Sequence, residues 1–204
     1  MSATQFSPPA DRNKQPILEV LQRLLPARGA ALEIASGTGQ HAAWFAAGLP
    51  GWTWQPTDRN DEGFESVTTW CAEAGAAGAA GVLPPRVLDV TAAPWPFGAI
   101  TFDAIYCANM LHISPWATCA GLMQGAARHL APQGLLITYG PYLEDEVPTA
   151  TGNLAFDESL RQRDPSWGIR RREDVVATAA EAGLVLRERI AMPANNLMLV
   201  FGRG

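Results

Sequence analysis

One short glycine-containing segment carries the clearest chemical signal in this chain. Residues 32–42 read LEIASGTGQHA, at the point where a predicted buried strand over 30–35 turns into a predicted helix over 40–47. Glycine adopts positive φ freely, and without a Cβ its backbone can pass close to a ligand. The free amides and positive dipole end of the following helix attract a negatively charged group. The segment therefore predicts a site for a nucleotide-like cofactor.

Two classes of cofactor fit this segment. Gly37 and Gly39, with an alanine three positions further on, match the dinucleotide fingerprint G-x-G-x-x-G/A, for which Asp58 is a candidate ribose ligand. The motif for S-adenosylmethionine (SAM) fits as well, since Glu33 precedes Ala35 and the glycines. Glu33 favours SAM, because a carboxylate within an apolar strand is costly unless a partner such as the methionine ammonium of SAM compensates it. A tight turn without any ligand is the remaining alternative.

Acidic residues stand at the ends of the next two predicted strands. Asp58 follows the strand predicted over 52–57, and its ionised carboxylate can accept hydrogen bonds from both ribose hydroxyls. Asp89 stands near the tip of the strand predicted over 86–90, where it could accept from the adenine amino group. Each could instead cap the turn that follows it. We assign both to the cofactor, with the cap nearly as well supported for Asp89.

The loop after the strand predicted over 102–108 contains Asn109 and His112. Asn109, which we also assign to the cofactor site, could accept a hydrogen bond from an attacking amine or hydroxyl. His112 could take the proton, because imidazole titrates near neutrality, at a pKa of about 6.5. A structural hydrogen bond that fixes the loop is an equally supported role for His112. Methyl transfer from a sulfonium needs mainly alignment, so no dominant catalytic side chain is required.

Two tyrosines leave the strand predicted over 134–139 beside a Gly-Pro pair. Tyr139 and Tyr142 could line an acceptor pocket or pack the loop, and the pocket is the favoured role. Residues 144–168 are expected to be irregular, and long irregular segments at a ligand face are commonly lids or specificity elements. We therefore expect a lid over 141–170 and assign to substrate binding, besides the tyrosines, Asn153, Phe156 and Trp167.

Several arginines fall within or just after this insert. Arg161, Arg163 and residues 170–172 could hold an acidic substrate, although a solvated helix face is the favoured interpretation. The chain contains three histidines without paired ligands, so we expect no metal site.

Apolar periodicity indicates a parallel sheet wrapped by helices. Predicted strands alternate with predicted helices along most of the chain. The strands are predicted over 30–35, 52–57, 86–90, 102–108 and 134–139, and the helices over 16–25, 40–47, 62–74, 114–130 and 172–182. The helix over 114–130 is expected to begin with Ser114 as its cap. The alanine- and glycine-rich run over 75–81 predicts a helix end followed by a flexible loop.

The C-terminal strands differ from the rest. Apolar strands predicted over 184–191 and 197–202 are separated by five residues, too few for a helical crossover, so they must form an antiparallel hairpin. This predicts an α/β, Rossmann-like class I methyltransferase fold. Its seven-stranded, mostly parallel sheet ends in an antiparallel hairpin and carries helices on both faces. We expect residues 1–204 to form a single domain.

Composition restricts the partners. The chain has 204 residues, a formal net charge of −5 and no extended basic run, which argues against nucleic acid. Its three cysteines form no CxxC pair and no disulfide framework, which fits a reducing compartment. No apolar stretch approaches the roughly 20 residues of a membrane span. We expect a cytoplasmic protein with no signal peptide, no membrane contact and a small-molecule partner, and we leave open whether it is a homodimer.

Seven stretches, covering much of the chain, resemble the family named domain of unknown function 938. They are residues 11–18, 32–42, 54–58, 109–116, 139–142, 156–160 and 164–168. The stretch over 109–116 is the most specific of them. The resemblance implies a SAM-dependent methyltransferase fold and adds little about the substrate.

The resemblance also favours placing the polar N-terminal segment, residues 1–26, over the cofactor. Arg12 or Lys14 could then pair with the methionine carboxylate, whereas a solvated helix start is the competing interpretation. Ala35 stands where methyltransferases commonly have glycine, and we expect it to keep a negative φ, which would reshape the loop slightly. The predicted cofactor site is completed by Asn13, Ser36 and His41, the last of which could instead contact polar loop atoms.

Taken together, these residues predict a SAM-dependent methyltransferase that acts on a small-molecule acceptor. An NAD-dependent oxidoreductase and a non-catalytic SAM-binding or protein-interaction module are the two alternatives. The acceptor atom stays open.

Overall fold

The computed structural model describes residues 4–76 and 81–204. Most of the alanine- and glycine-rich run, for which a loop was expected, therefore lies outside the described residues. The chain divides into two compact units. The first comprises Met1–Asp89 and Phe102–Tyr106, and the second comprises Val90–Thr101 and Cys107–Gly204.

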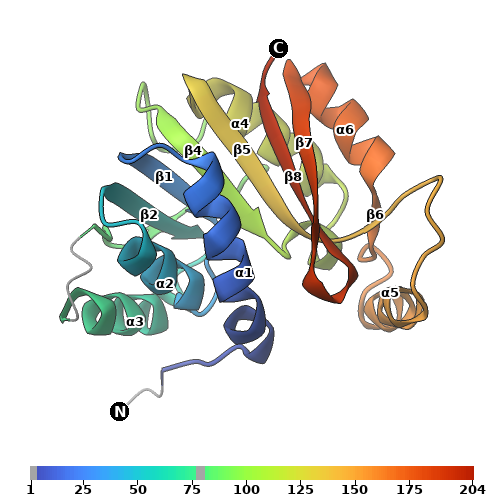
Figure 1. Ribbon diagram of the computed structural model, residues 1–204, viewed down its shortest axis with the longest axis horizontal. Coiled ribbons are helices and arrows are strands. Elements are labelled where there is room, and N and C mark those ends of the chain that lie inside the picture. The colour runs from blue at the N-terminus through green and yellow to red at the C-terminus, as the bar shows by residue number, and fades with distance from the viewer. Residues whose placement is uncertain (1–3, 77–80) are drawn as a thin grey trace. The chain divides into compact units, whose positions relative to one another are not determined.

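The first unit contains parallel strands and three helices (Figure 1). Strand β2 pairs in parallel with β1 and with β3, and helix α2 packs against α1 and α3. The last four residues of β1 are all buried, because a parallel strand covered by helices needs apolar side chains on both faces. The elements of this unit are α1 (Pro8–Leu24), β1 (Gly29–Ile34), α2 (Gln40–Gly48), β2 (Trp52–Asp58), α3 (Phe64–Ala76), β3 (Arg86–Val87) and most of β4 (Phe102–Ala108).

Helix α1 begins eight residues before the predicted helix start at residue 16. Ser7 caps it by accepting a hydrogen bond from the amide of Ala10, and Pro8 follows at the first helical position, where its missing N–H is not needed. Pro16, taken in the sequence as the first helical residue, lies inside the helix. The polar N-terminal segment is therefore largely helical from Pro8 onwards.

The second unit is built around an antiparallel core (Figure 1). Strand β8 pairs antiparallel with both β5 and β7, and helix α6 packs against β7 and α4. Strand β7 alternates buried and accessible side chains, whereas β8, which lies between β5 and β7, is buried along most of its length. The elements of this unit are η1 (Leu111–Ile113), α4 (Ala117–His129), β5 (Leu130–Leu143), α5 (Thr151–Arg163), β6 (Arg170–Arg171), α6 (Arg172–Glu181), β7 (Leu184–Met192), η2 (Pro193–Asn195) and β8 (Asn196–Arg203).

The strand order is β3-β2-β1-β4-β5-β8-β7, with β6 paired to β5 outside this path. The path of seven strands and the antiparallel C-terminal hairpin confirm the predicted Rossmann-like methyltransferase fold. The eighth strand, β6, has two residues and was not predicted; it pairs in parallel with the end of β5.

Three local predictions were wrong. The expected irregular insert contains helix α5, which has a single fully buried side chain, Leu160, and so lacks the apolar stripe that signals a helix in sequence. Helix α4 begins at Ala117 with no side-chain cap, because the Ser114 hydroxyl donates instead to the carbonyl of Met110. Strand β3 has two residues rather than the predicted five. Within the described residues, no helix has the length and apolar character needed to cross a membrane.

Candidate cofactor and acceptor sites

The glycine turn has the geometry that a close ligand requires. Gly37 and Gly39 have φ values of 55° and 88°, in the left-handed region that L-residues rarely adopt. A Cβ on Gly39 would lie 2.6 Å from the Cα of Val67, so this glycine lets α3 pack directly on the turn. A Cβ on Gly37 would meet nothing within 4 Å. The turn is therefore packed at Gly39 and open at Gly37.

Ala35 has a φ of 55°, which corrects the expectation of a negative value. Ala35 thus adopts a conformation that glycine prefers, next to a residue that is hydrogen-bonded to β2. On the following residue, the Ser36 amide donates to the carbonyl of Thr57 at 2.8 Å, and the amide of Thr57 donates to Ser36 Oγ at 3.2 Å. These bonds attach the turn to the end of β2.

Asp58 lies beside the glycine turn. Its Oδ2 accepts a hydrogen bond from the amide of Gly37 at 2.9 Å, and its Oδ1 accepts one from the amide of Arg59 at 2.7 Å. Two predicted cofactor residues 21 positions apart are thus brought together. The hydrogen bond from Arg59 is the local cap that was the alternative role predicted for Asp58. The carboxylate therefore accepts hydrogen bonds both from its own turn and from the glycine turn. Asp89 lies two residues beyond β3 and is half-buried.

Glu33 is buried in the first unit and has a protein partner. Its Oε2 accepts a hydrogen bond from the indole N–H of Trp54 at 2.6 Å. Burial raises the pKa of Glu33 to about 8, the bond from Trp54 lowers it, and the charge of Asp58 raises it further. The carboxyl group is therefore poised near its titration point at neutral pH, where a nearby cation would favour the ionised form.

Two of the predicted N-terminal contacts with the cofactor, Asn13 and Lys14, have protein partners of their own. Asn13 Oδ1 lies 2.7 Å from His41 Nε2, which connects α1 to α2. Burial lowers the pKa of His41 to about 4, so this imidazole is neutral at pH 7. Lys14 pairs with Asp11 and lies over the ring of Trp44, 4.5 Å from its centroid, while Arg12 is exposed on α1.

In the second unit, Asn109 and His112 converge on Gly140 of β5. A Cβ on Gly140 would lie 3.4 Å from His112 Nδ1 and 3.6 Å from Asn109 Oδ1. Asn109 has a φ of 59°, which asparagine tolerates better than most residues, and its amide donates to the carbonyl of Tyr139 at 2.8 Å. The structure thus brings the two predicted catalytic side chains together, 31 and 28 residues before the glycine they face.

The imidazole of His112 is buried and neutral. Burial lowers its pKa to about 4, and the positive charge of Arg170 lowers it as well. The ring of Phe156, from α5, packs edge-on against it with centroids 5.5 Å apart. One predicted substrate residue therefore lies directly against a predicted catalytic residue, and the Phe156 side chain is still 40% exposed.

A cavity of about 190 Å³ lies at the end of β5, between the start of α5 and the turn joining β7 to β8. Two of the predicted substrate residues, Tyr142 and Asn153, contribute to its wall. The Tyr142 hydroxyl donates to Thr138 Oγ1 at 2.8 Å, and Asn153 donates to the carbonyl of Asn195 at 3.1 Å. Tyr139, Phe156 and Trp167 do not line this cavity; Tyr139 is buried in β5.

The cavity wall also contains residues that the sequence did not single out. Glu144 is almost buried and pairs with Arg172 at 2.7 Å and with Arg189. These arginines lower the pKa of Glu144, chiefly through the hydrogen bond from Arg189, which keeps the carboxylate ionised. No signal in the sequence could have shown this cluster, because its members come from three separate elements.

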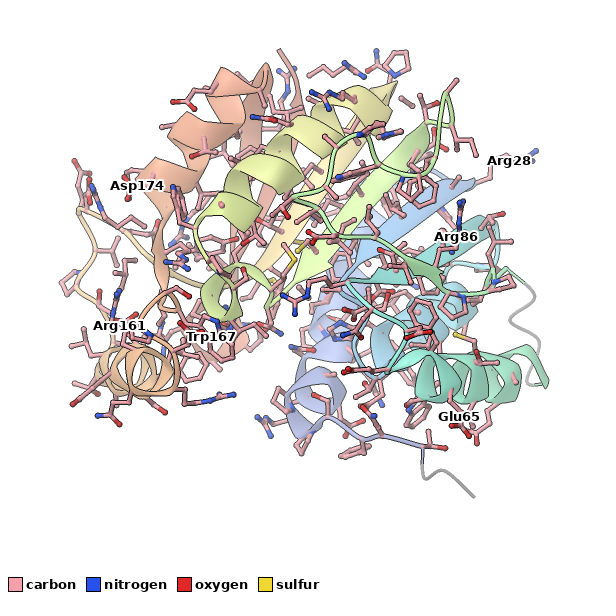
Figure 2. All side chains as sticks on the ribbon, turned by 180° about the vertical axis from the view of Figure 1, so that it is seen from behind. Arg28, Glu65, Arg86, Arg161, Trp167 and Asp174 are labelled. Carbon is pink, nitrogen blue, oxygen red and sulfur yellow. The ribbon has the colours of Figure 1, made fainter. Side chains whose placement is uncertain are left out.

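Arg161 and Arg163 of the insert are exposed on helix α5, and each has a partner within the second unit. Figure 2 shows Arg161 and Trp167 at the α5 end of the second unit. Arg161 pairs with Asp157 on the same helix, and the guanidinium of Arg163 lies 5.0 Å from the centroid of the Trp167 ring. The run over 170–172 is likewise paired with acidic side chains or backbone carbonyls.

Comparison with known proteins connects this geometry to a family and a fold. A family model described as "Protein of unknown function (DUF938)" matches residues 4–203. Similar solved structures include an O-methyltransferase family protein from Burkholderia thailandensis, with a TM-score of 0.78 and 17% identity over 94% of this chain and 56% of that one.

Two further structures have the same fold. An O-methyltransferase family 2 protein from Planctomyces limnophilus in complex with apigenin has a TM-score of 0.79 and 18% identity, covering 96% of this chain and 58% of that one. CalO1, a methyltransferase of calicheamicin biosynthesis solved with S-adenosylhomocysteine (SAH) bound, has a TM-score of 0.72 and 16% identity, covering 94% and 54%. The chain thus spans a little over half the length of these structures, and the likeness concerns the fold.

Proposed function

Since the chain belongs to the DUF938 family and has the fold of SAM-dependent methyltransferases, we propose that it transfers a methyl group from SAM to a small-molecule acceptor. The observation that carries this proposal is the glycine turn, which is open at Gly37 and bordered by the carboxylate of Asp58. Carboxylate oxygens only accept hydrogen bonds, as binding of ribose hydroxyls requires.

The residues of the first unit suit SAM chemically. When bound, SAM supplies a methyl group on a positively charged sulfur atom. Glu33 would hold the methionine ammonium, because a cation shifts this carboxyl, with its pKa of about 8, towards the ionised form. Asp58 would bind the ribose, and the open backbone at Gly37 would let the cofactor approach the turn.

The strand order argues against the NAD-dependent alternative. A dinucleotide-binding fold continues with parallel strands on both sides of its switch point. Here β8 runs antiparallel between β5 and β7. We therefore propose SAM as the cofactor rather than NAD.

On the acceptor side, we propose that Asn109 and His112 serve an attacking hydroxyl. Asn109 Oδ1 would accept the hydrogen bond that orients the oxygen. His112, neutral because its pKa is about 4, would take the proton as the acceptor oxygen forms its bond to carbon. The O–H bond would break as the new C–O bond forms, and the C–S bond of SAM would break with its electron pair left on the neutral sulfur of SAH. The proton would pass to the imidazole and from there to solvent.

Calorimetric titration with SAH tests the cofactor. We expect SAH to bind the wild-type protein, NAD not to bind, and Asp58→Ala to lose most of the affinity. The matched control is Asp103→Ala, because Asp103 Oδ2 also accepts a hydrogen bond from a backbone amide, that of Ala30 at 2.9 Å, but at the amino ends of the strands. Absence of SAH binding, or equal losses in both variants, would refute the proposal.

A further inference from the structure

Arg170 is bound to the segment that carries His112. Its Nε donates to the carbonyl of Leu111 at 2.9 Å, and one terminal nitrogen donates to the carbonyl of Ser114 at 2.5 Å and to that of Ser166 at 2.8 Å. The guanidinium also lies over the ring of Trp116, 5.6 Å from its centroid. Arg170 thus holds carbonyls on both sides of His112 in the chain.

The segment needs such a partner. Residues 111–114, called the turn below, consist of the short 3₁₀ helix η1 (Leu111–Ile113) and Ser114, which ends it; the last carbonyls of such a helix have no partner within the helix itself. Arginine can reach several carbonyls at once, because its planar fork presents five N–H donors in fixed directions, whereas lysine offers a single flexible ammonium. A second contact comes from just before β6: the amide of Gly168 donates to the carbonyl of His112 at 3.0 Å.

Gly168, just before β6, and Arg170, at its start, therefore both bind carbonyls of the turn. Arg170 pairs with Tyr142 in the strand register, at the end of β5, while Gly140 lies two residues earlier on that strand. The imidazole of His112 is held between these contacts, beside Asn109 and against Phe156. Its position is set by backbone contacts that Arg170 makes rather than by a hydrogen bond to the ring.

We propose that Arg170 is a positioning residue for the methyl-transfer reaction: it holds the turn over residues 111–114 so that the His112 imidazole faces Asn109 and Gly140. The catalytic consequence of this inference rests on the proposed function. Its structural consequence, a firmly held turn, rests on the hydrogen bonds of Arg170. Arg170 does not touch the acceptor in this role.

The charged surroundings of His112 are simple. The groups that face its ring, from Asn109, Gly140 and Phe156, are uncharged, and Arg170 is the charge that acts on its pKa. The pKa of Arg170 is itself lowered, chiefly by burial and then by the charge of Arg161. Cys119 and Asp157 act in the opposite direction and raise it. Removing the guanidinium charge should therefore raise the pKa of His112 from its value of about 4.

The test compares Arg170→Gln and Arg170→Lys with Arg171→Gln. Arg171 is the neighbouring arginine, half-exposed and paired with Asp145, so its substitution removes the same charge without touching the turn. Hydrogen exchange of the amides over residues 109–118 reports how firmly the turn is held. Titration of the ¹³C-labelled imidazoles by NMR, with His112→Gln for assignment, gives the pKa of His112.

In Arg170→Gln we expect exchange over 109–118 to accelerate about tenfold or more and the His112 pKa to rise. Arg170→Lys should keep the low pKa but recover only part of the protection, because the ammonium cannot reach all three carbonyls. Arg171→Gln should change neither. If exchange and pKa in Arg170→Gln match those of Arg171→Gln, the proposal is wrong.

SAH titration of the same proteins separates this inference from the proposed function. Wild-type protein that fails to bind SAH would refute the cofactor assignment, whereas the exchange and pKa results concern the turn alone. If Arg170→Gln does not fold, Arg170→Lys still decides the case, since full protection in that variant would contradict the need for the guanidinium fork.

Discussion

Replacement of Ala35 by glycine should stabilise the protein slightly, although the same change elsewhere destabilises proteins. Ala35 has a φ of 55°, and the left-handed region costs an L-residue about 1–2 kcal/mol. Glycine removes this cost, but it increases the entropy of the unfolded chain by about 0.4–1 kcal/mol. The half-buried methyl group contributes roughly another 0.4 kcal/mol. The net change in the free energy of unfolding is therefore an increase of about 0.5 kcal/mol.

Ala72→Gly provides the matched control. Ala72 is exposed within α3, where glycine costs about 1 kcal/mol relative to alanine. The two variants should thus differ by about 1.5 kcal/mol in urea unfolding. At this chain length, that difference corresponds to roughly 3–6 °C in Tm. If Ala35→Gly destabilises as much as Ala72→Gly, the backbone at position 35 is not left-handed and the account of the turn is wrong.

Three further changes test the sites. Gly39→Ala should cost about 2–3 kcal/mol in urea unfolding and abolish SAH binding, because its Cβ would lie 2.6 Å from the Cα of Val67 at a φ of 88°. Glu33→Gln should stabilise the protein at pH 8 by about 4 kcal/mol relative to its effect at pH 4, measured as the free energy of unfolding against pH. Glu144→Gln should cost about 2 kcal/mol, because it leaves the guanidinium of Arg189 without its carboxylate.

The sign of the Glu33 prediction follows from proton binding. The pKa of Glu33 is about 8 in the folded protein and about 4.3 in an unfolded chain, so the folded state holds the extra proton between these values. Its contribution to stability is present below pH 4 and is lost as the pH rises to 8. Glutamine has no such proton, and the difference between the two proteins isolates this group. Equal pH profiles for both would contradict the raised pKa.

Controls for the other two variants come from the same turn and the same cluster. Gly37 has a φ of 55°, but a Cβ added there would meet no atom within 4 Å. Gly37→Ala should therefore lower the free energy of unfolding by about 1 kcal/mol, less than Gly39→Ala does. Asp145→Asn, in an exposed pair with Arg171, should change stability by at most about 0.5 kcal/mol. Gly37→Ala as damaging as Gly39→Ala, or Glu144→Gln as mild as Asp145→Asn, would refute the corresponding reasoning.

Helix α5 illustrates where sequence patterns give no signal. Its exposed side chains include Leu154 and Phe156, and its one fully buried residue is Leu160, so no apolar stripe marks it as a helix. The helix is held instead by side-chain contacts to distant segments, such as that of Asn153 to Asn195. Secondary structure stabilised in this way cannot be recognised from local periodicity.

What the sequence by itself determined is local. The buried run of β1, the glycines at 37 and 39, and the short connection before β8 each follow from neighbouring residue types, because strand burial, positive φ and hairpin closure are decided within a few positions. These features sufficed for the methyltransferase fold and for the position of the glycine turn.

The tertiary structure alone decided which side chains meet. It brings Asp58 to the amide of Gly37, gives Glu33 the indole of Trp54 as its partner, and holds the turn of His112 through Arg170, 58 residues further along the chain. Such pairs depend on the register of strands and on burial, which shift pKa values and fix rotamers through contacts between distant segments. No local pattern encodes them, and for that reason the role of Arg170 emerged only from the folded protein.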